Sequence, residues 1–213
     1  MSDQKHPRVD RIFSRRRTTV DEVHGVMLAA IIDGELIAGD ELRDQRWATE
    51  LSLSRTPIRE AIKRLECHGL ADVAAARYTR VASFTALSAR REAEGWAAIH
   101  IAVLRTIKAP FRRRFIAQLE TVSRQCQNAT SSRYRATKFA FFARIRAENE
   151  DFSVKLGATT AAYRLHLALP TLPEHHDADL ALHVDVIAAL RRKDLDGLEA
   201  IFARWTAAVT RPD

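Results

Sequence analysis

The chain has 213 residues, 46% of them hydrophobic and 29% charged, a composition typical of a soluble protein with room for two small domains. No apolar run approaches the roughly 20 residues of a membrane-spanning helix, and the polar N-terminus lacks the apolar stretch of a signal peptide. The two cysteines, Cys67 and Cys126, do not form a C-x-x-C pair, which argues against disulfide scaffolds and zinc ribbons. We therefore expect a cytoplasmic protein with no membrane partner.

The net charge of +7 suggests a polyanionic partner, but its distribution does not locate a binding site. Residues 1–82 contain 14 Lys and Arg against 13 Asp and Glu, whereas residues 83–213 contain 20 against 14. A nucleic-acid site must therefore be found from the placement of individual basic side chains.

Residues 1–17 are polar and end in three arginines, and we expect a flexible arm there. Two interpretations stay open, a solvated tail and an arm that contacts DNA. An amphipathic helix follows within residues 18–34, with Thr19 and Glu22 forming a capping box at its start and Gly34 ending it.

The next stretch, to residue 83, predicts two further helices and a hairpin. A short helix is expected over about 43–51, and a longer one begins at Pro57 and ends at Gly69. Thr56 is its expected N-cap, because proline disfavours a helical residue before it. The β-like runs 70–74 and 79–83 form the hairpin, which completes a domain over residues 18–83.

From about residue 85 the apolar spacing predicts helices alone. They are expected over 85–107, 111–127, 133–149, 152–168, 177–192 and 194–209. The fold class is therefore mainly α, with an N-terminal winged helix-turn-helix that includes a small β-hairpin and a C-terminal all-α helical bundle over residues 84–213. Four phenylalanines are expected in the core of the bundle, Phe139, Phe141, Phe142 and Phe152.

The helix at Pro57 has an aliphatic side and a basic side. Its apolar residues recur at the spacing of one buried face: Ile58, Ala61, Ile62 and Leu65. Thr56, Arg59 and Lys63 project from roughly the opposite side. Arg55 and Arg59 lie near the positive end of the helix, which suits a phosphate or a guanine edge. A solvated basic face is the alternative for a single helix, but the preceding helix, the turn and the hairpin favour a DNA-binding helix-turn-helix.

The stretch "AIIDGELIAGDEL…ATELSLSRTPIREAIKRLECHGL" resembles the winged helix-turn-helix of GntR-family bacterial transcription regulators. The residues that carry this resemblance are Gly34, Leu36, Gly39, Leu42, Ala48, Leu51, Ser54, Arg55, Thr56, Pro57, Arg59, Glu60, Ala61, Leu65, Gly69 and Leu70. The helical region that follows is similar in length and layout to the effector domain of the FadR-like branch.

The resemblance implies that Arg46, Arg55, Thr56 and Arg59 contact DNA. Among them, we expect Arg59 to read a base edge and Arg46 to bind a backbone phosphate. The wing departs from the family pattern, since Tyr78 stands where relatives usually have glycine. Arg77 or Arg80 is the remaining wing residue expected to contact phosphate.

Many FadR-like regulators bind a divalent metal through one aspartate and three histidines. The matching positions here are Lys138, Phe142, His183 and Trp205. An ammonium repels a metal cation and an indole does not bind one, so we predict no metal there and no other cofactor.

Lys138 lies on the stripe of Phe142 and Ile145 and is expected to face the interior, where its charge needs an anionic partner. We therefore predict that Lys138, with His183, holds an acidic effector; a lysine that reaches solvent, or a helix register shifted by one residue, is the alternative. His183 is otherwise a hydrogen-bonded core histidine, or a member of a site with His166, His175 and His176.

The leading functional prediction is a homodimeric transcription regulator, most often a repressor in this family, that binds a double-stranded DNA operator and responds to a small organic acid. A second possibility is an effector-blind regulator whose bundle only dimerises. An enzyme is the third and weakest, since the sequence shows no phosphate-binding glycine loop, nucleophile elbow or H-E-x-x-H motif.

Overall fold

The structure is a computed structural model that describes residues 20–74, 77–107, 113–129, 131–172 and 175–211. The expected arm over residues 1–17 and the expected capping residue Thr19 lie outside the described residues. The chain divides into two compact units, the first ending at Ser83 and the second beginning at Phe84. No helix in the described ranges is long and apolar enough to cross a membrane.

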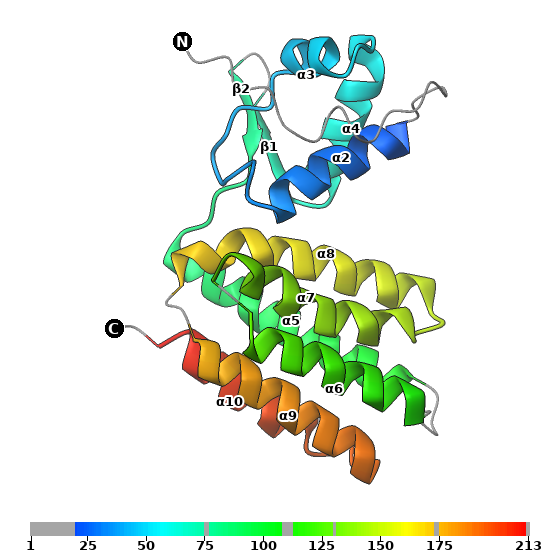
Figure 1. The fold of residues 1–213 in the computed structure, drawn as a ribbon. Coiled ribbons are helices and arrows are strands. Elements are labelled where there is room, and N and C mark those ends of the chain that lie inside the picture. Colours follow the sequence, from blue (N-terminus) through cyan, green and yellow to red (C-terminus); the bar gives the residue numbers. More distant parts are fainter. Residues whose placement is uncertain (1–19, 75–76, 108–112, 130, 173–174, 212–213) are drawn as a thin grey trace. The chain divides into compact units, whose positions relative to one another are not determined.

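The first unit contains three described helices and a two-stranded antiparallel hairpin (Figure 1). Helices α2 (Val20–Ile32), α3 (Asp44–Glu50) and α4 (Arg55–Cys67) are followed by strands β1 (Ala71–Ala74) and β2 (Tyr78–Val81). This order of helix, helix, helix and wing confirms the sequence-based expectation for the fold of the unit.

Helices α2 and α4 pack against each other and form the core of the first unit. Val23 and Met27 of α2 are fully buried, as are Ile58 and Leu65 of α4. Short α3 packs on α4 and buries the indole of Trp47. Burial of several large apolar side chains, each contributing roughly 1.5–3 kcal/mol, therefore fixes the face that α4 leaves to solvent.

Helix α4 begins earlier than predicted. Ser54 is its N-cap and Arg55 its first residue, so Thr56 is a helical residue and the expectation that it caps the helix is wrong. The first four N–H groups of a helix have no acceptor within it. Pro57, at the third position, therefore removes no hydrogen bond and can stand inside the first turn.

The hairpin is held in register by four residue pairs that run from Ala71 opposite Val81 to Ala74 opposite Tyr78. Backbone hydrogen bonds join it to the segment that leads into α3, where Leu42 N–H donates to the Thr79 carbonyl and Val81 N–H to the Asp40 carbonyl, both at 2.8 Å. Gly39 in that segment has a φ of +90°, a conformation open to glycine and strained for other residues. The wing is thereby tied to the start of α3 as well as to α4.

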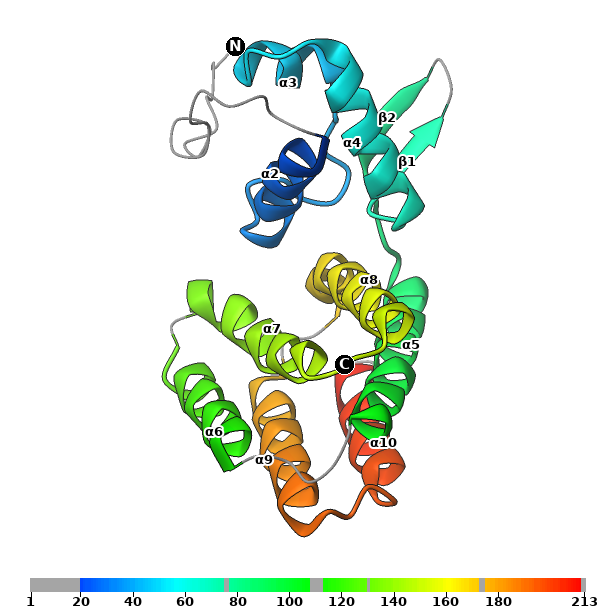
Figure 2. The ribbon, with the colours of Figure 1, turned by 90° about the vertical axis from the view of Figure 1, so that its right-hand side faces the viewer.

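The second unit is all-helical in the described ranges apart from the loops that join its helices. It contains α5 (Ala86–Thr106), α6 (Arg113–Gln127), α7 (Ser131–Ala147), α8 (Phe152–Ala168), the short 3-10 helix η1 (Leu169–Thr171), α9 (His176–Arg192) and α10 (Leu198–Val209). The six long helices pack as a ring in the order α5, α8, α7, α6, α9, α10 and back to α5 (Figure 2). This arrangement confirms the predicted fold class for the chain.

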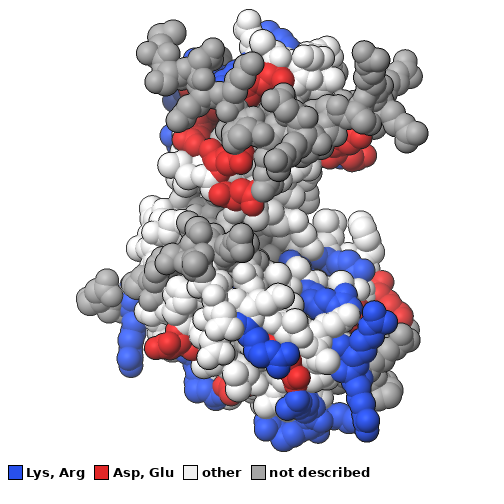
Figure 3. Space-filling model, in the orientation of Figure 1, with Lys and Arg blue, Asp and Glu red and all other residues white. Residues whose placement is uncertain are grey.

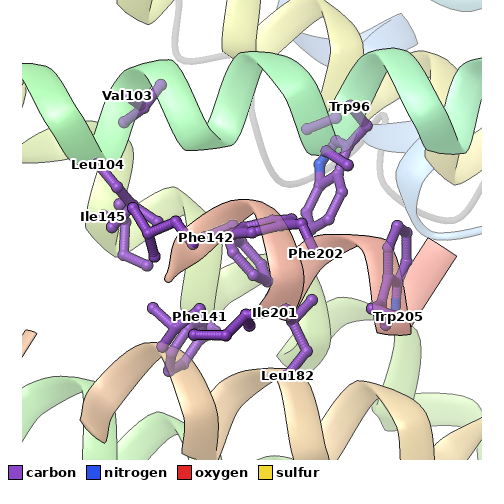
Figure 4. Close-up of a cluster of buried hydrophobic side chains, with 14 of the residues drawn as sticks. Trp96, Val103, Leu104, Phe141, Phe142, Ile145, Leu182, Ile201, Phe202 and Trp205 are labelled. Carbon is purple, nitrogen blue, oxygen red and sulfur yellow. The ribbon is translucent and has the colours of Figure 1, made fainter. Parts of the chain in front are cut away.

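Aromatic side chains fill the middle of the ring (Figure 4). The Trp96 ring lies 4.5 Å from that of Phe142 and 4.8 Å from that of Trp205, measured between centroids. Phe141 and Phe142 are buried as predicted, and Phe139 packs against the same core. Phe152 is a correction, because it is 75% exposed. It is the first residue of α8 and precedes the buried stripe of that helix, which begins at Ala158.

Candidate nucleic-acid interface

A groove of about 930 Å³ on the first unit is lined by the start of α3, the outer face of α4 and the hairpin. Five of the six residues predicted to bind DNA line it: Arg55, Thr56, Arg59, Lys63 and Arg77. All five are exposed. The sixth, Arg46, lies on α3 outside the groove lining, where its Nε donates to Glu50 Oε1 at 2.7 Å.

Charge alone does not single out this groove. Its lining has five basic side chains, Arg43, Arg55, Arg59, Lys63 and Arg77, and four acidic ones, Glu41, Asp44, Glu60 and Glu66. On the face drawn in Figure 3, Lys and Arg side chains are also spread widely over the helical unit. The groove is distinguished instead by three of its basic groups, Arg55, Arg59 and Lys63, which lie along one helix whose opposite face is buried.

The first turn of α4 adds hydrogen-bond donors to those basic groups. Ser54 makes no side-chain capping bond, so the backbone N–H groups at the start of α4 have no acceptor from the N-cap. The positive end of the helix dipole lies at the same place. Free amides, the dipole, Arg55 and Arg59 together form an arrangement that suits a phosphate oxygen or the acceptor edge of a guanine.

Asp44 pairs with the arginines at this end of the groove. Its carboxylate accepts from Arg55 Nε at 3.2 Å and from Arg55 Nη2 at 2.8 Å and 3.0 Å. Arg59 Nε lies 4.0 Å from Asp44 Oδ2, a longer and weaker approach. Arg55 is therefore held in one orientation, whereas Arg59, whose side chain is 73% exposed, is held less firmly.

The two wing arginines differ in position. Arg77 is exposed and lines the groove. The guanidinium of Arg80 instead lies 4.1 Å from the centroid of the Tyr78 ring and is not part of the groove lining. Of the two, Arg77 is the one whose placement suits a phosphate contact.

Lys138, the predicted effector residue, lies in the interior of the second unit and already has an anionic partner. Its Nζ is 2.7 Å from Oδ2 of Asp179 on α9. The same carboxylate accepts from the Tyr134 hydroxyl at 2.8 Å and from the Trp205 indole at 2.7 Å. Burial and the neighbouring Asp179 both raise the pKa of Tyr134, so its hydroxyl stays a donor. An acidic ligand at Lys138 would therefore have to compete with Asp179.

His183 is fully buried, with its ring stacked on Phe141 at 3.9 Å between centroids. Neither ring nitrogen has a hydrogen-bond partner among the described residues, so the expectation of a hydrogen-bonded core histidine is not met. Burial lowers the pKa of His183 to about 4, an effect that Lys138 adds to and Asp179 opposes. The side chain is therefore a neutral aromatic member of the core at pH 7.

The residues at the family's metal position do not fit a metal ion. An ammonium occupies the place of one ligand, and the Trp205 N–H donates to Asp179. Within the described ranges, no group of three or more His, Cys, Asp or Glu side chains could hold a metal. His166, His175, His176 and His183 are not brought together as such a group.

Two acidic residues were not predicted from the sequence, Asp44 in the groove and Asp179 beside Lys138. Asp179 shares a helical face with Leu182, His183 and Val186, and an aspartate inside an apolar stripe is a signal that its partner is buried too. Asp44, 11 residues before Arg55, gave no comparable signal, because only the packing of α3 on α4 brings the two together.

Comparison with known proteins agrees with this geometry. Residues 19–81 match the family described as "Bacterial regulatory proteins, gntR family". No curated protein matches the chain in sequence. The family match covers the helices and the hairpin that form the groove, including all six residues predicted to bind DNA.

Solved structures extend the likeness to both units. A transcriptional regulator GntR from Rhodococcus sp. RHA1 gives a TM-score of 0.74 at 16% identity, covering 90% of this chain and 95% of that one. McbR/YncC of E. coli gives a TM-score of 0.64 at 16% identity, covering 91% of this chain and 95% of that one. Lar of Listeria monocytogenes gives a TM-score of 0.52 at 15% identity, covering 92% of this chain and 97% of that one. At such identities these likenesses show the fold. Residues 19–81 therefore form a winged helix-turn-helix domain that matches the GntR family, and the fold of the chain is similar to that of solved transcription regulators.

Proposed function

We propose that this protein is a sequence-specific, DNA-binding transcription regulator that acts as a homodimer on a double-stranded operator in the cytoplasm. One observation carries the proposal: α4 buries its aliphatic face and presents Arg55, Thr56 and Arg59 in an exposed groove at its positive end. A recognition helix needs this division, because one face must pack on the domain while the other enters the major groove.

In this proposal the basic side chains contact different parts of the duplex. Arg59 reads a base edge, and Lys63 and Arg77 contact phosphates on either side of it. Arg46, outside the groove lining, reaches a backbone phosphate from α3 after releasing Glu50. Two copies of α4 then occupy two half-sites of a short palindrome about one helical turn apart.

The helical unit supplies dimerisation in this proposal, and regulation takes the form of repression, as is usual in the family. An acidic effector at Lys138 and His183 remains a proposal that requires Asp179 to be displaced. The buried Lys138–Asp179 pair favours the second candidate, an effector-blind regulator, because the interior charge is already balanced without a ligand.

Thermal unfolding in the presence of small organic acids separates these two candidates. An acid that binds only the folded state stabilises it by about 2.7 kcal/mol at a hundredfold excess over its dissociation constant. A shift with one acid supports effector sensing. The absence of any shift across a panel of mono- and dicarboxylates supports the effector-blind regulator.

Selection of DNA from a random pool by the purified full-length protein tests the proposed function itself. We expect a short palindromic sequence to be enriched and then bound at least roughly a thousandfold more tightly than unrelated DNA. Enrichment of no sequence, with equal binding to all duplexes, contradicts the proposal.

A further inference from the structure

We infer that Asp44 is a positioning residue that makes Arg55 a preorganised reader of guanine and sets the preference of the protein for its own site over other DNA. The inference rests on the proposed function, which assigns the groove to DNA but gives Asp44 no part in it. The inference follows from the position of Asp44, which binds one of the two hydrogen-bonding edges of the Arg55 guanidinium.

A guanidinium presents two hydrogen-bonding edges, one formed by Nε and Nη2 and the other by Nη1 and Nη2. Asp44 binds the first edge, since its carboxylate contacts Nε at 3.2 Å and Nη2 at 2.8 Å. The second edge therefore points away from Asp44. Two parallel N–H groups on that edge match the O6 and N7 acceptors of guanine in the major groove.

The exposure of the pair indicates that its role is not in folding. The side chain of Arg55 is 60% exposed and that of Asp44 is 24% exposed. Ion pairs this open to solvent contribute little to stability. What the contact does is restrict the rotamers of a long side chain before DNA arrives, which lowers the entropy lost on binding.

The negative charge of Asp44 has a second effect, on DNA of the wrong sequence. Binding without sequence preference depends almost wholly on phosphate contacts by Lys and Arg. A carboxylate among these arginines opposes the phosphates of every duplex alike, whereas only a correctly placed guanine accepts from the free edge of Arg55. Asp44 therefore weakens unspecific binding and retains the specific contact.

The groove offers a matched control for the charge alone. Glu41 also lines it and accepts from Arg43 Nε at 2.8 Å, but the structure shows it paired with neither Arg55 nor Arg59. Glu41→Gln and Asp44→Asn each remove one negative charge from the same groove. Only Asp44→Asn releases the Arg55 guanidinium.

The test measures binding of full-length native protein, Asp44→Asn, Glu41→Gln, Arg55→Ala and the Asp44→Asn/Arg55→Ala double variant. Each is titrated with the selected operator, with single base-pair substitutions of it and with an unrelated duplex at one salt concentration. Circular dichroism and thermal unfolding verify that every variant is folded.

We expect Asp44→Asn to lower the ratio of specific to unspecific affinity by roughly three- to tenfold, the effect of ordering one long side chain before binding. The preference should be lost at the same guanine as in Arg55→Ala. The ratio of specific to unspecific affinity in the double variant should be no lower than in Arg55→Ala alone. Glu41→Gln raises affinity for all duplexes alike and keeps the ratio within about twofold of native.

Two results would overturn the inference while leaving the proposed function intact. One is an Asp44→Asn variant that behaves like Glu41→Gln, with affinity raised equally for every duplex. The other is a loss of preference at a different base pair from that affected in Arg55→Ala. A native protein that selects no sequence contradicts the proposed function instead, and with it the role of Asp44.

Discussion

The ammonium of Lys138 lies 2.7 Å from Oδ2 of Asp179 in the middle of the helical unit, with side chains only 6% and 4% exposed. Tyr134 and Trp205 donate to the same carboxylate, so α7, α9 and α10 meet at one aspartate. Both charges have been removed from water, and each is balanced mainly by the other. Loss of either partner leaves a buried charge without a counter-ion.

Replacing Lys138 with methionine is therefore expected to destabilise the protein strongly. The free energy of unfolding should fall by about 3–5 kcal/mol, because among the described residues the Asp179 carboxylate keeps only the Tyr134 and Trp205 donors. Urea unfolding of the full-length chain, followed by circular dichroism, measures the change.

An exposed ion pair in the same unit provides the control. Arg204 Nη2 lies 2.7 Å from Asp185 Oδ2, the same separation, but these side chains are 63% and 41% exposed. Arg204→Met is expected to change the free energy of unfolding by less than about 1 kcal/mol. Equal stability of Lys138→Met and Arg204→Met would show that the buried pair has no special structural role.

The stability of the protein is expected to fall as the pH is lowered from 7 to 5, in part because of His183. Its pKa is about 4 in the folded protein and 6.5 in the unfolded chain, so the unfolded state takes up a proton first. At pH 5 this difference destabilises the folded state by about 2 kcal/mol relative to pH 7.

The variant His183→Phe tests this assignment, since a phenyl ring can also stack on Phe141. Urea unfolding at pH 7 and pH 5 measures how far the free energy of unfolding falls between the two pH values. This fall should be smaller in His183→Phe than in the native protein by about 2 kcal/mol. The remaining loss includes His100, whose pKa burial lowers to about 3 and whose Nε2 faces the buried Arg146 guanidinium at 3.2 Å. An unchanged loss in His183→Phe would exclude His183 as the titrating group.

Arg59→Ala separates base reading from phosphate binding at the second arginine of α4. We expect a loss of about 1–3 kcal/mol in binding to the selected operator, with relaxed preference at one base pair. Binding to single base-pair substitutions of the operator measures this. A loss of the same size for every duplex would make Arg59 a phosphate contact.

The arrangement of elements was predictable because it depends on local patterns. The apolar spacing of Ile58, Ala61, Ile62 and Leu65 identifies the buried face of α4, and all four are buried. The start of α4 was less predictable, because Pro57 is tolerated at several positions of the first turn and Ser54 is an equally good N-cap. The exposure of Phe152 was not predictable either, because apolar spacing at the end of a helix does not show which side chains reach the core.

The partners of charged side chains could not be predicted, because they depend on contacts between distant segments. The spacing around Lys138 implied that it faces inward and needs an anion, but nothing in the spacing identified Asp179, 41 residues later, as that anion. Likewise, the sequence of α4 alone predicts its basic face. The pairing of Asp44 with Arg55 could not be predicted in this way, because it depends on the packing of α3 on α4.

The most direct test of the central claim, that the exposed basic face of α4 binds DNA, is the salt dependence of binding to the selected operator. The logarithm of the binding constant should fall linearly with the logarithm of salt concentration, and Lys63→Ala should reduce the slope by about one while leaving the sequence preference unchanged. A native protein whose binding does not depend on salt, or a Lys63→Ala variant with the native slope and affinity, would contradict it.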